Sequence, residues 1–248
     1  MPKIEVSKMK ALTAEIFHAA GLSTSDAATV AHLIVLSNVR GHDSHGVRQI
    51  PRYIKLVRDK DIPAQVNIVV ERETATTAVL NAGNGMGQLG ATRAMQLAIA
   101  KAKEMHIAGV SVHALNHIGR VGAYPEMAAA EGMIGMCFVS SHNSERKTTP
   151  FGGIDTKMGT NPIAVGFPFP GGNPVLVDFA SSVVAVNKIR QAFDRKKPAG
   201  PGWIVDRDGE PIDDPAMFVE GKALLLPLGG AQGHKGYCLA VMNELFSG

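Results

Sequence analysis

Apolar residues at helical spacing occupy the N-terminal part of the chain. They predict one helix over residues 7–20, ended by Gly21, and a second helix that ends near Gly41. Ser23 and Asp26, three residues apart, are typical of a capping box at the start of the second helix. One face of this helix carries Val30, Leu33 and Ile34.

Further helices are predicted along the rest of the chain. His45–Tyr53 fits a short helix that Pro51 weakens or breaks. The same periodicity predicts helices over residues 89–105, 122–132 and 236–246. Their apolar faces carry Met95, Ala98, Ile99 and Ala102 in the first of these, and Leu239, Met242 and Phe246 in the last.

Short apolar runs between the helices indicate strands. These runs are Thr76–Asn81, Val110–Ala114, Ile134–Ser140, Ile163–Phe167 and Val175–Val177. Residues 194–222 are polar and rich in proline, which predicts a loop. Helices and strands together predict a mixed α/β protein, with a boundary near residues 115–120.

Composition narrows the class of protein. The 248 residues suffice for one large domain or two modest ones. A net charge of +3, without a block of Lys or Arg, does not favour nucleic acid. Apolar runs fall short of the ~18 residues that a membrane helix needs, and the N-terminus has no apolar signal core. We therefore expect a cytoplasmic protein that binds neither nucleic acid nor membrane.

Two cysteines, Cys137 and Cys238, each stand among apolar neighbours. Without a CxxC spacing, they predict buried, reduced thiols in a reducing compartment.

The segment Gly85-Met-Gly87-Gln-Leu-Gly90 matches a GxGxxG motif between a strand and a helix. A Rossmann site also needs a carboxylate at the end of the next strand, to bind the ribose of the dinucleotide. That strand ends near Val112-His113-Ala114, without an acidic residue. The motif therefore favours a glycine turn that shapes helix packing.

Residues 41–53 gather side chains suited to acid–base chemistry. On a helix, His45, Gln49, Arg52 and Tyr53 would share one face. A histidine can exchange the proton of a hydroxyl group near neutral pH, and an arginine can clamp a carboxylate with paired hydrogen bonds. A solvated charged face explains the same pattern, and so does a metal pair formed by His42 and His45.

His117 lies in a glycine-rich loop directly after a predicted strand. Such a position suits a functional site, although a histidine that only bonds the backbone would stand there equally well.

Polar residues in the C-terminal half suggest contacts to phosphate and ribose. Thr160 and Asn161 lie in one such loop, and a strand ends at Asp178 before Ser181 and Ser182. Asp178 could bind a ribose hydroxyl, and hydroxyl groups at a helix start favour either a phosphate or plain N-capping. The loop that ends at His234 and Lys235 also suits a phosphate, although an ordinary mobile loop has the same composition.

Taken in order, these motifs closely resemble the type-2 malate/L-lactate dehydrogenase family, from about residue 5 to 248. They read DSHGVR, NHIGRVGAY, GTNPIAV, LVDFASS, GWIVDRDGEPIDDP and LPLGG followed by HKGYCLA.

The resemblance implies a two-domain fold that is not Rossmann, an intertwined homodimer, and NAD or NADP as cofactor. It implies that residues 1–117 form the helical, substrate and dimer domain and residues 118–248 the NAD(P)-binding domain. It also implies a 2-hydroxy or 2-oxo acid substrate that resembles malate or lactate. Some relatives reduce cyclic imino acids instead.

Matched to the family motifs, His45 is the acid/base, and Ser44, Tyr53 and His117 line the substrate. Thr160, Asn161, Asp178, Ser181, Ser182, His234 and Lys235 correspond to the cofactor-binding segments.

The chain departs from the family at two points. Many relatives carry arginine at the position of Gln49, so Arg48 or Arg52 would have to clamp the carboxylate. Relatives also usually continue past the last helix, so we expect a chain truncated at its C-terminus with apolar surface exposed. The alternatives are an inactive or cofactor-binding-only relative and a metal hydrolase that uses His42, His45 and His117.

Overall fold

The computed structural model describes residues 4–140 and 146–247. It divides the chain into two compact units. The first comprises Met1–Gly135 with Gly166–Leu176, and the second comprises Met136–Val165 with Val177–Gly248. The division predicted at residues 117 and 118 concerns substrate and cofactor binding, and it stays a prediction.

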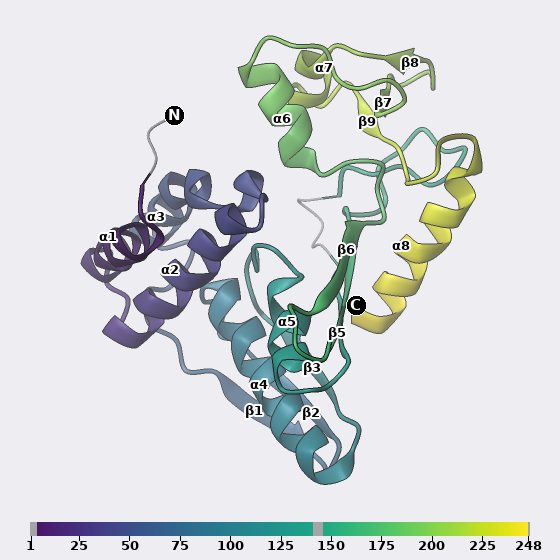
Figure 1. Ribbon diagram of the computed structural model, residues 1–248. Coiled ribbons are helices and arrows are strands. Elements are labelled where there is room, and N and C mark those ends of the chain that lie inside the picture. Colours follow the sequence, from purple (N-terminus) through teal and green to yellow (C-terminus); the bar gives the residue numbers. More distant parts are fainter. Residues whose placement is uncertain (1–3, 141–145, 248) are drawn as a thin grey trace. The chain divides into compact units, whose positions relative to one another are not determined.

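The first unit opens with a cluster of helices (Figure 1). Its helical elements are α1 (Val6–Ala19), α2 (Thr24–Val39), the 3-10 turns η1 (Asp43–His45) and η2 (Val47–Gln49), α3 (Ile50–Arg58), α4 (Gly87–Met105) and α5 (Ala123–Ala130). A shared core of α1, α2, α3 and the start of α4 includes Phe17, Val30, Ile34, Tyr53 and Leu89. Burial of these side chains is the main force that holds the helices together.

The end of α1 and the start of α2 are set by the residues that the sequence predicted. Gly21 has a positive φ of 106°, a conformation that favours glycine, and α1 ends just before it. The Ser23 side chain accepts a hydrogen bond of 3.1 Å from the backbone N–H of Asp26, which caps α2. Both predictions are confirmed.

The predicted helix over His45–Tyr53 is wrong in its start. His45 closes the 3-10 turn η1, and the regular helix α3 begins only at Ile50. Pro51 lies in the first turn of α3, where its missing N–H costs nothing, so it starts the helix instead of breaking it. His45 and Tyr53 therefore do not share a helical face.

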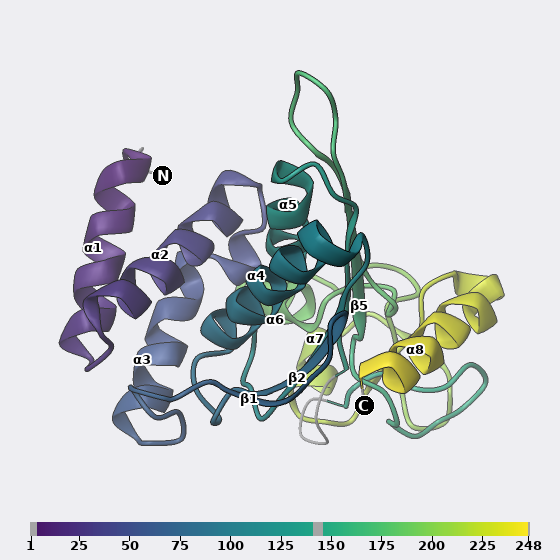
Figure 2. The same cartoon turned by 90° about the horizontal axis from the view of Figure 1, so that it is seen from below.

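A three-stranded sheet completes the first unit. Its strands β1 (Val69–Glu73), β2 (Thr77–Asn81) and β3 (Gly109–His113) lie in the order β1-β2-β3. β2 and β3 are parallel and α4 connects them, packing along the sheet (Figure 2). β1 is antiparallel to β2, and the sequence did not reveal it because its residues are mostly exposed. The unit is thus not a doubly wound Rossmann sheet.

The glycines of the GxGxxG motif allow close packing. A Cβ added at Gly87 would lie 2.0 Å from the carbonyl oxygen of Asn116. At Gly90 it would lie 2.8 Å from the Cβ of Ala82, and at Gly85 it would lie 2.6 Å from the Val66 side chain. The interpretation as a packing turn is confirmed for this segment.

The second unit contains a sheet ordered β4-β5-β6 and a small sheet ordered β8-β7-β9. Its elements are β4 (Gly135–Phe138), β5 (Pro162–Phe167), β6 (Val175–Ala180), α6 (Val186–Asp194), β7 (Ile204–Val205), β8 (Pro211–Ile212), α7 (Pro215–Val219), β9 (Leu224–Leu225), η4 (Gly230–Gln232) and α8 (Gly233–Ser247). Five residues of the sheet β4-β5-β6 belong to the first unit: Gly135 of β4, Gly166 and Phe167 of β5, and Val175 and Leu176 of β6.

Residues 194–222 are not simply a loop, contrary to the prediction. They include β7, β8 and α7, whose apolar residues Ile204 and Phe218 join a buried cluster with Ile189. The prolines of this segment suggested a loop, but they lie at positions that tolerate proline in regular structure. Pro211 is the first residue of an edge strand, and Pro215 is the first residue of α7.

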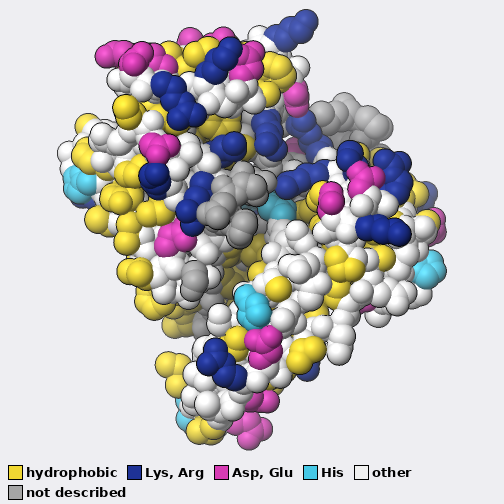
Figure 3. Space-filling view, turned by 180° about the vertical axis from the view of Figure 1, so that it is seen from behind, with side chains coloured by type: hydrophobic (Ala, Val, Ile, Leu, Met, Phe, Trp, Pro, Cys, Tyr) yellow, Lys and Arg dark blue, Asp and Glu magenta, His cyan; other side chains and the backbone are white. Residues whose placement is uncertain are grey.

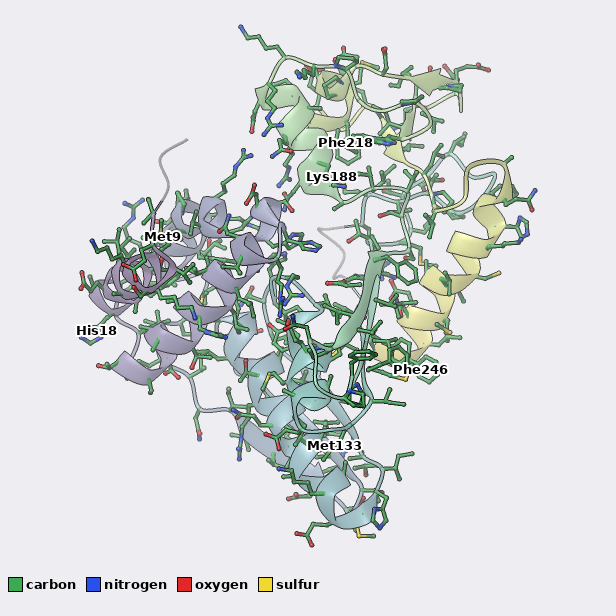
Figure 4. All side chains as sticks on the ribbon, viewed as in Figure 1. Met9, His18, Met133, Lys188, Phe218 and Phe246 are labelled. Carbon is green, nitrogen blue, oxygen red and sulfur yellow. The ribbon has the colours of Figure 1, made fainter. Side chains whose placement is uncertain are left out.

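Helix α8 is present, but its buried face differs from the predicted one. Gly236, Ala240 and Asn243 are buried, whereas Phe246 is 66% exposed and stacks on Phe138. Figure 4 labels Phe246 on α8 and the buried Phe218 on α7. Small residues face inward because the helix lies against backbone: a Cβ at Gly236 would lie 2.3 Å from the carbonyl oxygen of Leu228.

The cysteines follow the prediction only in part. Both are free, but Cys238 is exposed. Burial, with the neighbouring Asp178 charge, raises the pKa of the Cys137 thiol to about 12. Hydrophobic side chains also reach the surface elsewhere, in yellow in Figure 3. None of the described helices combines the length and apolar character that crossing a lipid bilayer requires.

The close approach at Gly87 yields a stability prediction. Gly87→Ala should lower the free energy of unfolding by about 1–3 kcal/mol, because the new methyl group overlaps backbone that cannot move away cheaply. Thermal unfolding measures the change. Gly109→Ala is the matched control, since its Cβ would meet no described atom within 4 Å. Equal melting temperatures for the two variants would contradict this account.

Candidate active site

A hydrogen-bonded turn holds His45 at the end of η1. The Asn38 amide donates to the carboxylate of Asp43 at 2.6 Å and accepts from the backbone N–H of Val47 at 2.8 Å, so it spans the turn. A Cβ at Gly46 would overlap the Asn38 side chain, which explains why glycine follows His45. The Ser44 hydroxyl lies 2.9 Å from His45 Nδ1 and orients the imidazole ring.

A second turn presents His117. The Asn116 amide donates to the carbonyl oxygens of Asn84 and Gly85, at 2.6 and 3.1 Å. The Tyr124 hydroxyl donates to the carbonyl oxygen of Ile118. These bonds join the loop after β3 to the start of α4 and to α5, so the backbone around His117 is fixed on both sides.

The two turns bring three of the predicted substrate residues together. The rings of His45 and His117 stack, with centroids 5.5 Å apart and planes inclined by 17°. The Tyr53 hydroxyl lies 2.5 Å from His117 Nδ1. Ser44 joins this group through its bond to His45. The residues come from η1, α3 and the loop after β3, all within the first unit.

Burial keeps Tyr53 and His117 uncharged. It raises the pKa of Tyr53 to about 12, while the Gln88 amide and the Arg52 charge act in the opposite direction. Burial, and then the charges of His45 and Arg52, lower the pKa of His117 to about 3. At neutral pH, Tyr53 is therefore a protonated phenol and His117 an uncharged imidazole, so the pair shares one neutral hydrogen bond.

The two candidate arginines are both exposed. The charge of Arg52 lowers the pKa of Tyr53 and of His117, so it acts on both groups electrostatically. Gln49 is buried and its amide donates to the carbonyl oxygen of Ser44 at 2.6 Å, so it supports the turn. The described residues contain no group of three side chains that could hold a metal ion, and the metal hydrolase gains no support.

Two residues of this region were not singled out by the sequence. Gln88 and Arg120 are buried and line a narrow pocket together with His45, Ser37 and Gly119. The Arg120 guanidinium donates at 2.6 Å to Glu126, which also pairs with Arg40. Both residues stand inside motifs quoted above, but only the fold shows that their side chains point inward.

In the second unit, hydrogen bonds join two of the predicted cofactor residues, Ser181 and Thr160, and tie a third, Asn161, to α8. The Ser181 hydroxyl donates to the carbonyl oxygen of Thr160 at 3.1 Å, and its backbone N–H donates to the same atom. Asn161, with φ of 34°, is fully buried and donates to Glu244 on α8 at 2.9 Å.

The premise that the serines open a helix is wrong. Helix α6 begins at Val186, with Ala185 as its N-cap. Ser182 is buried and its hydroxyl donates to the carbonyl oxygen of Val184 at 2.9 Å. The Ser181 hydroxyl therefore bonds backbone just before β5, and the Ser182 hydroxyl bonds backbone of the loop between β6 and α6.

The remaining predicted cofactor residues are more accessible. Asp178 is partly buried in β6. His234 and Lys235 are exposed in the first turn of α8, where backbone N–H groups point outward, and His234 meets the edge of the Phe151 ring. An exposed lysine in the first turn of a helix suits an anionic ligand.

Comparison with known proteins identifies a family. Residues 4–248 match the sequence profile of the malate/L-lactate dehydrogenase family. The chain is 35% identical over 236 residues to hydroxycarboxylate dehydrogenase B of Escherichia coli K12, which covers 94% of this chain. It spans 64% of that relative's length.

Solved structures share the fold. Malate dehydrogenase from Entamoeba histolytica superposes with a TM-score of 0.94 at 30% identity, over 98% of this chain and 69% of that one. A delta1-piperideine-2-carboxylate reductase from Pseudomonas syringae superposes with a TM-score of 0.91 at 30% identity, over 100% of this chain and 72% of that one. The mixed α/β, non-Rossmann fold expected from the resemblance is confirmed.

The lowered pKa of His117 predicts a loss of stability in acid. Below its ordinary pKa of 6.5, His117 binds a proton in the unfolded chain but stays neutral in the folded one. The contribution of the neutral His117 to the free energy of unfolding is present above pH 6.5. Roughly 1–2 kcal/mol of it should be lost by pH 5. Urea unfolding at pH 7 and pH 5 measures this loss.

His117→Gln should reduce the acid loss, although His32, whose pKa is also lowered by burial and by Lys10, contributes in the same direction and remains. His42→Gln changes an exposed histidine near the same site and serves as the control. If His117→Gln and His42→Gln behaved alike, the burial of a neutral His117 would not explain the acid sensitivity.

Proposed function

Since the chain belongs to the malate/L-lactate dehydrogenase family, we propose that it transfers a hydride between a nicotinamide cofactor and C2 of a small 2-hydroxy or 2-oxo acid. The observation that carries this proposal is the cluster of His45, His117 and Tyr53, held by hydrogen bonds on fixed turns. Such a cluster places a titratable nitrogen beside neutral polar groups, which acid–base exchange with a hydroxyl requires.

In this proposal, His45 exchanges the substrate proton. During oxidation its Nε2 accepts the proton of the C2 hydroxyl as the C2–H bond breaks and the C2–O bond becomes a carbonyl. During reduction the protonated His45 returns it. Ser44 fixes the orientation of the His45 ring through Nδ1. The neutral His117, bonded to Tyr53, offers polar contact without a charge that would compete for the proton.

We assign the carboxylate clamp to Arg52 rather than to Arg48. Arg52 influences both Tyr53 and His117 electrostatically, so its charge reaches the cluster. A guanidinium suits a carboxylate because two parallel N–H groups match its two oxygens. Gln49, in the position where many relatives carry arginine, already donates to Ser44 and leaves the clamp to another residue.

The residues of the second unit fit a nicotinamide dinucleotide in part. His234, Lys235 and the first N–H groups of α8 would hold a phosphate, and Asp178 would hold a ribose hydroxyl. Three predicted cofactor residues already form hydrogen bonds within the protein through their side chains: Ser181, Ser182 and Asn161. In this proposal, these residues and Thr160 would position the backbone around the cofactor and would not bind it through their side chains. When bound, NAD or NADP supplies or accepts the hydride at C4 of the nicotinamide.

The similarity to a delta1-piperideine-2-carboxylate reductase favours one second candidate, the reduction of a cyclic imino acid. That substrate also carries a carboxylate beside the reacting carbon, so the same arginine clamp would serve. We further propose a homodimer in the cytoplasm, as the family resemblance implies. A chain that binds cofactor but turns over neither class of substrate would match the inactive alternative.

The acid–base role of His45 is tested by substitution. His45→Ala should lower kcat for reduction of 2-oxo acids by about 10²–10⁴-fold, because proton transfer loses its positioned group. Oxidation of NADH or NADPH, followed by absorbance with oxaloacetate or pyruvate, measures turnover. The exposed His42, changed to alanine, is the control and should leave kcat unchanged. Equal turnover of native chain and His45→Ala would remove His45 from the mechanism.

Cofactor binding is tested without turnover. Thermal unfolding with NADH, NADPH or neither should show a higher melting temperature with one cofactor. At ~100 times the dissociation constant, binding adds about 2.7 kcal/mol, or several degrees. Lys235→Ala should reduce this shift, because a phosphate contact is lost. A cooperative transition that neither cofactor moves would argue against the proposed cofactor site.

A further inference from the structure

The Gln88 side chain has no evident structural task. It is 1% exposed, and neither its amide nitrogen nor its oxygen has a hydrogen-bond partner among the described residues. It lies beside the Tyr53 hydroxyl, yet no bond of acceptable distance and angle forms there. A buried primary amide with both ends unpaired is costly, and folded proteins seldom retain one without another use for it.

The surroundings of Gln88 indicate what that use is. Gln88 lines the same narrow pocket as His45, the proposed acid/base. Gly119, with φ of 79°, packs against the amide: a Cβ there would lie in van der Waals contact with the Gln88 nitrogen, at 3.7 Å. The close contact at Gly87, the preceding residue, holds the backbone of this first turn of α4 against Asn116 and His117.

A second unpaired donor lines this pocket. The Arg120 side chain is 2% exposed, and its Nε has no hydrogen-bond partner among the described residues. Glu126 balances only one of the two guanidinium groups that it contacts, those of Arg120 and Arg40. The three groups therefore carry one net positive charge next to a pocket with unpaired N–H groups. This combination suits an oxygen-rich anion.

We propose that Gln88 contacts the substrate directly, its amide N–H donating to an oxygen of the 2-oxo or 2-hydroxy acid beside His45, with Arg120 supporting the substrate's negative charge. This inference rests on the proposed function and adds Gln88 to the residues that bind substrate. In this proposal, the hydrogen-bond partner that the Gln88 amide lacks in the free protein is an oxygen atom of the bound substrate.

Gln88→Met separates this role from a structural one. Methionine keeps the length of the side chain and removes both amide groups. The melting temperature of the free protein should rise by about 2–4 °C, because an unpaired buried amide is lost. The KM for the 2-oxo acid should rise about tenfold or more, because its hydrogen bond is lost. A structural residue would give a lower melting temperature instead.

Gln96→Met is the matched control, because Gln96 lies on the same helix with its side chain exposed. It should change neither quantity. Gln88→Glu keeps the length and the oxygen but brings a negative charge, so its KM for the anionic substrate should exceed that of Gln88→Met.

The outcomes are distinguishable. If the native chain neither binds nor turns over any 2-oxo acid, the proposed function is rejected. The proposed contact between Gln88 and the substrate is then rejected as well. An active native chain whose KM is unchanged in Gln88→Met rejects the Gln88 assignment alone. A lower melting temperature together with an unchanged KM identifies Gln88 as a structural residue.

Discussion

The candidate site depends on one close approach of backbone to backbone. At Gly87, the first turn of α4 meets the carbonyl groups of Asn116 and His117, and any side chain there would collide with them. The Asn116 amide reinforces the contact by bonding the turn before α4. Because His117 stands in the contact itself, its position follows from a steric fit that the glycine makes possible.

This contact also bears on the charge state of the side chains in the site. His117 and Tyr53 are brought under the helices, where burial suppresses the charge of both. His45 is held from the other side by Asn38 and Ser44, on a turn that belongs to no regular helix. The arrangement therefore combines a hydrogen-bonded scaffold with polar side chains held in fixed positions, as a binding site requires.

The second unit shows a different use of small residues. Helix α8 turns Gly236 and Ala240 toward the protein, and Asn243 donates from the same face to the carbonyl oxygens of Asn161 and Pro162. The loop before β5 is thus held by side-chain amides on α8. Such a helix has little apolar contrast between its faces, which explains why the face with Leu239, Met242 and Phe246 is not the buried one.

The sequence by itself determined the elements whose causes are local. The period of α1, α2 and α4, the cap at Ser23 and the stop at Gly21 depend on residues a few positions apart. The order of motifs also determined the family and the grouping of Ser44, His45, Tyr53 and His117. The start of α3 at Ile50 was misjudged because the effect of a proline such as Pro51 is favourable or disruptive according to its place in the helix.

Only the tertiary structure decided which polar groups are buried and which are paired. Nothing in the sequence around Gln88 or Arg120 distinguishes them from exposed residues of an amphipathic segment. Their burial follows from contacts with η1, α2 and the loop after β3, which lie tens of residues away along the chain. Local periodicity carries no information about such contacts, because packing between distant segments sets them.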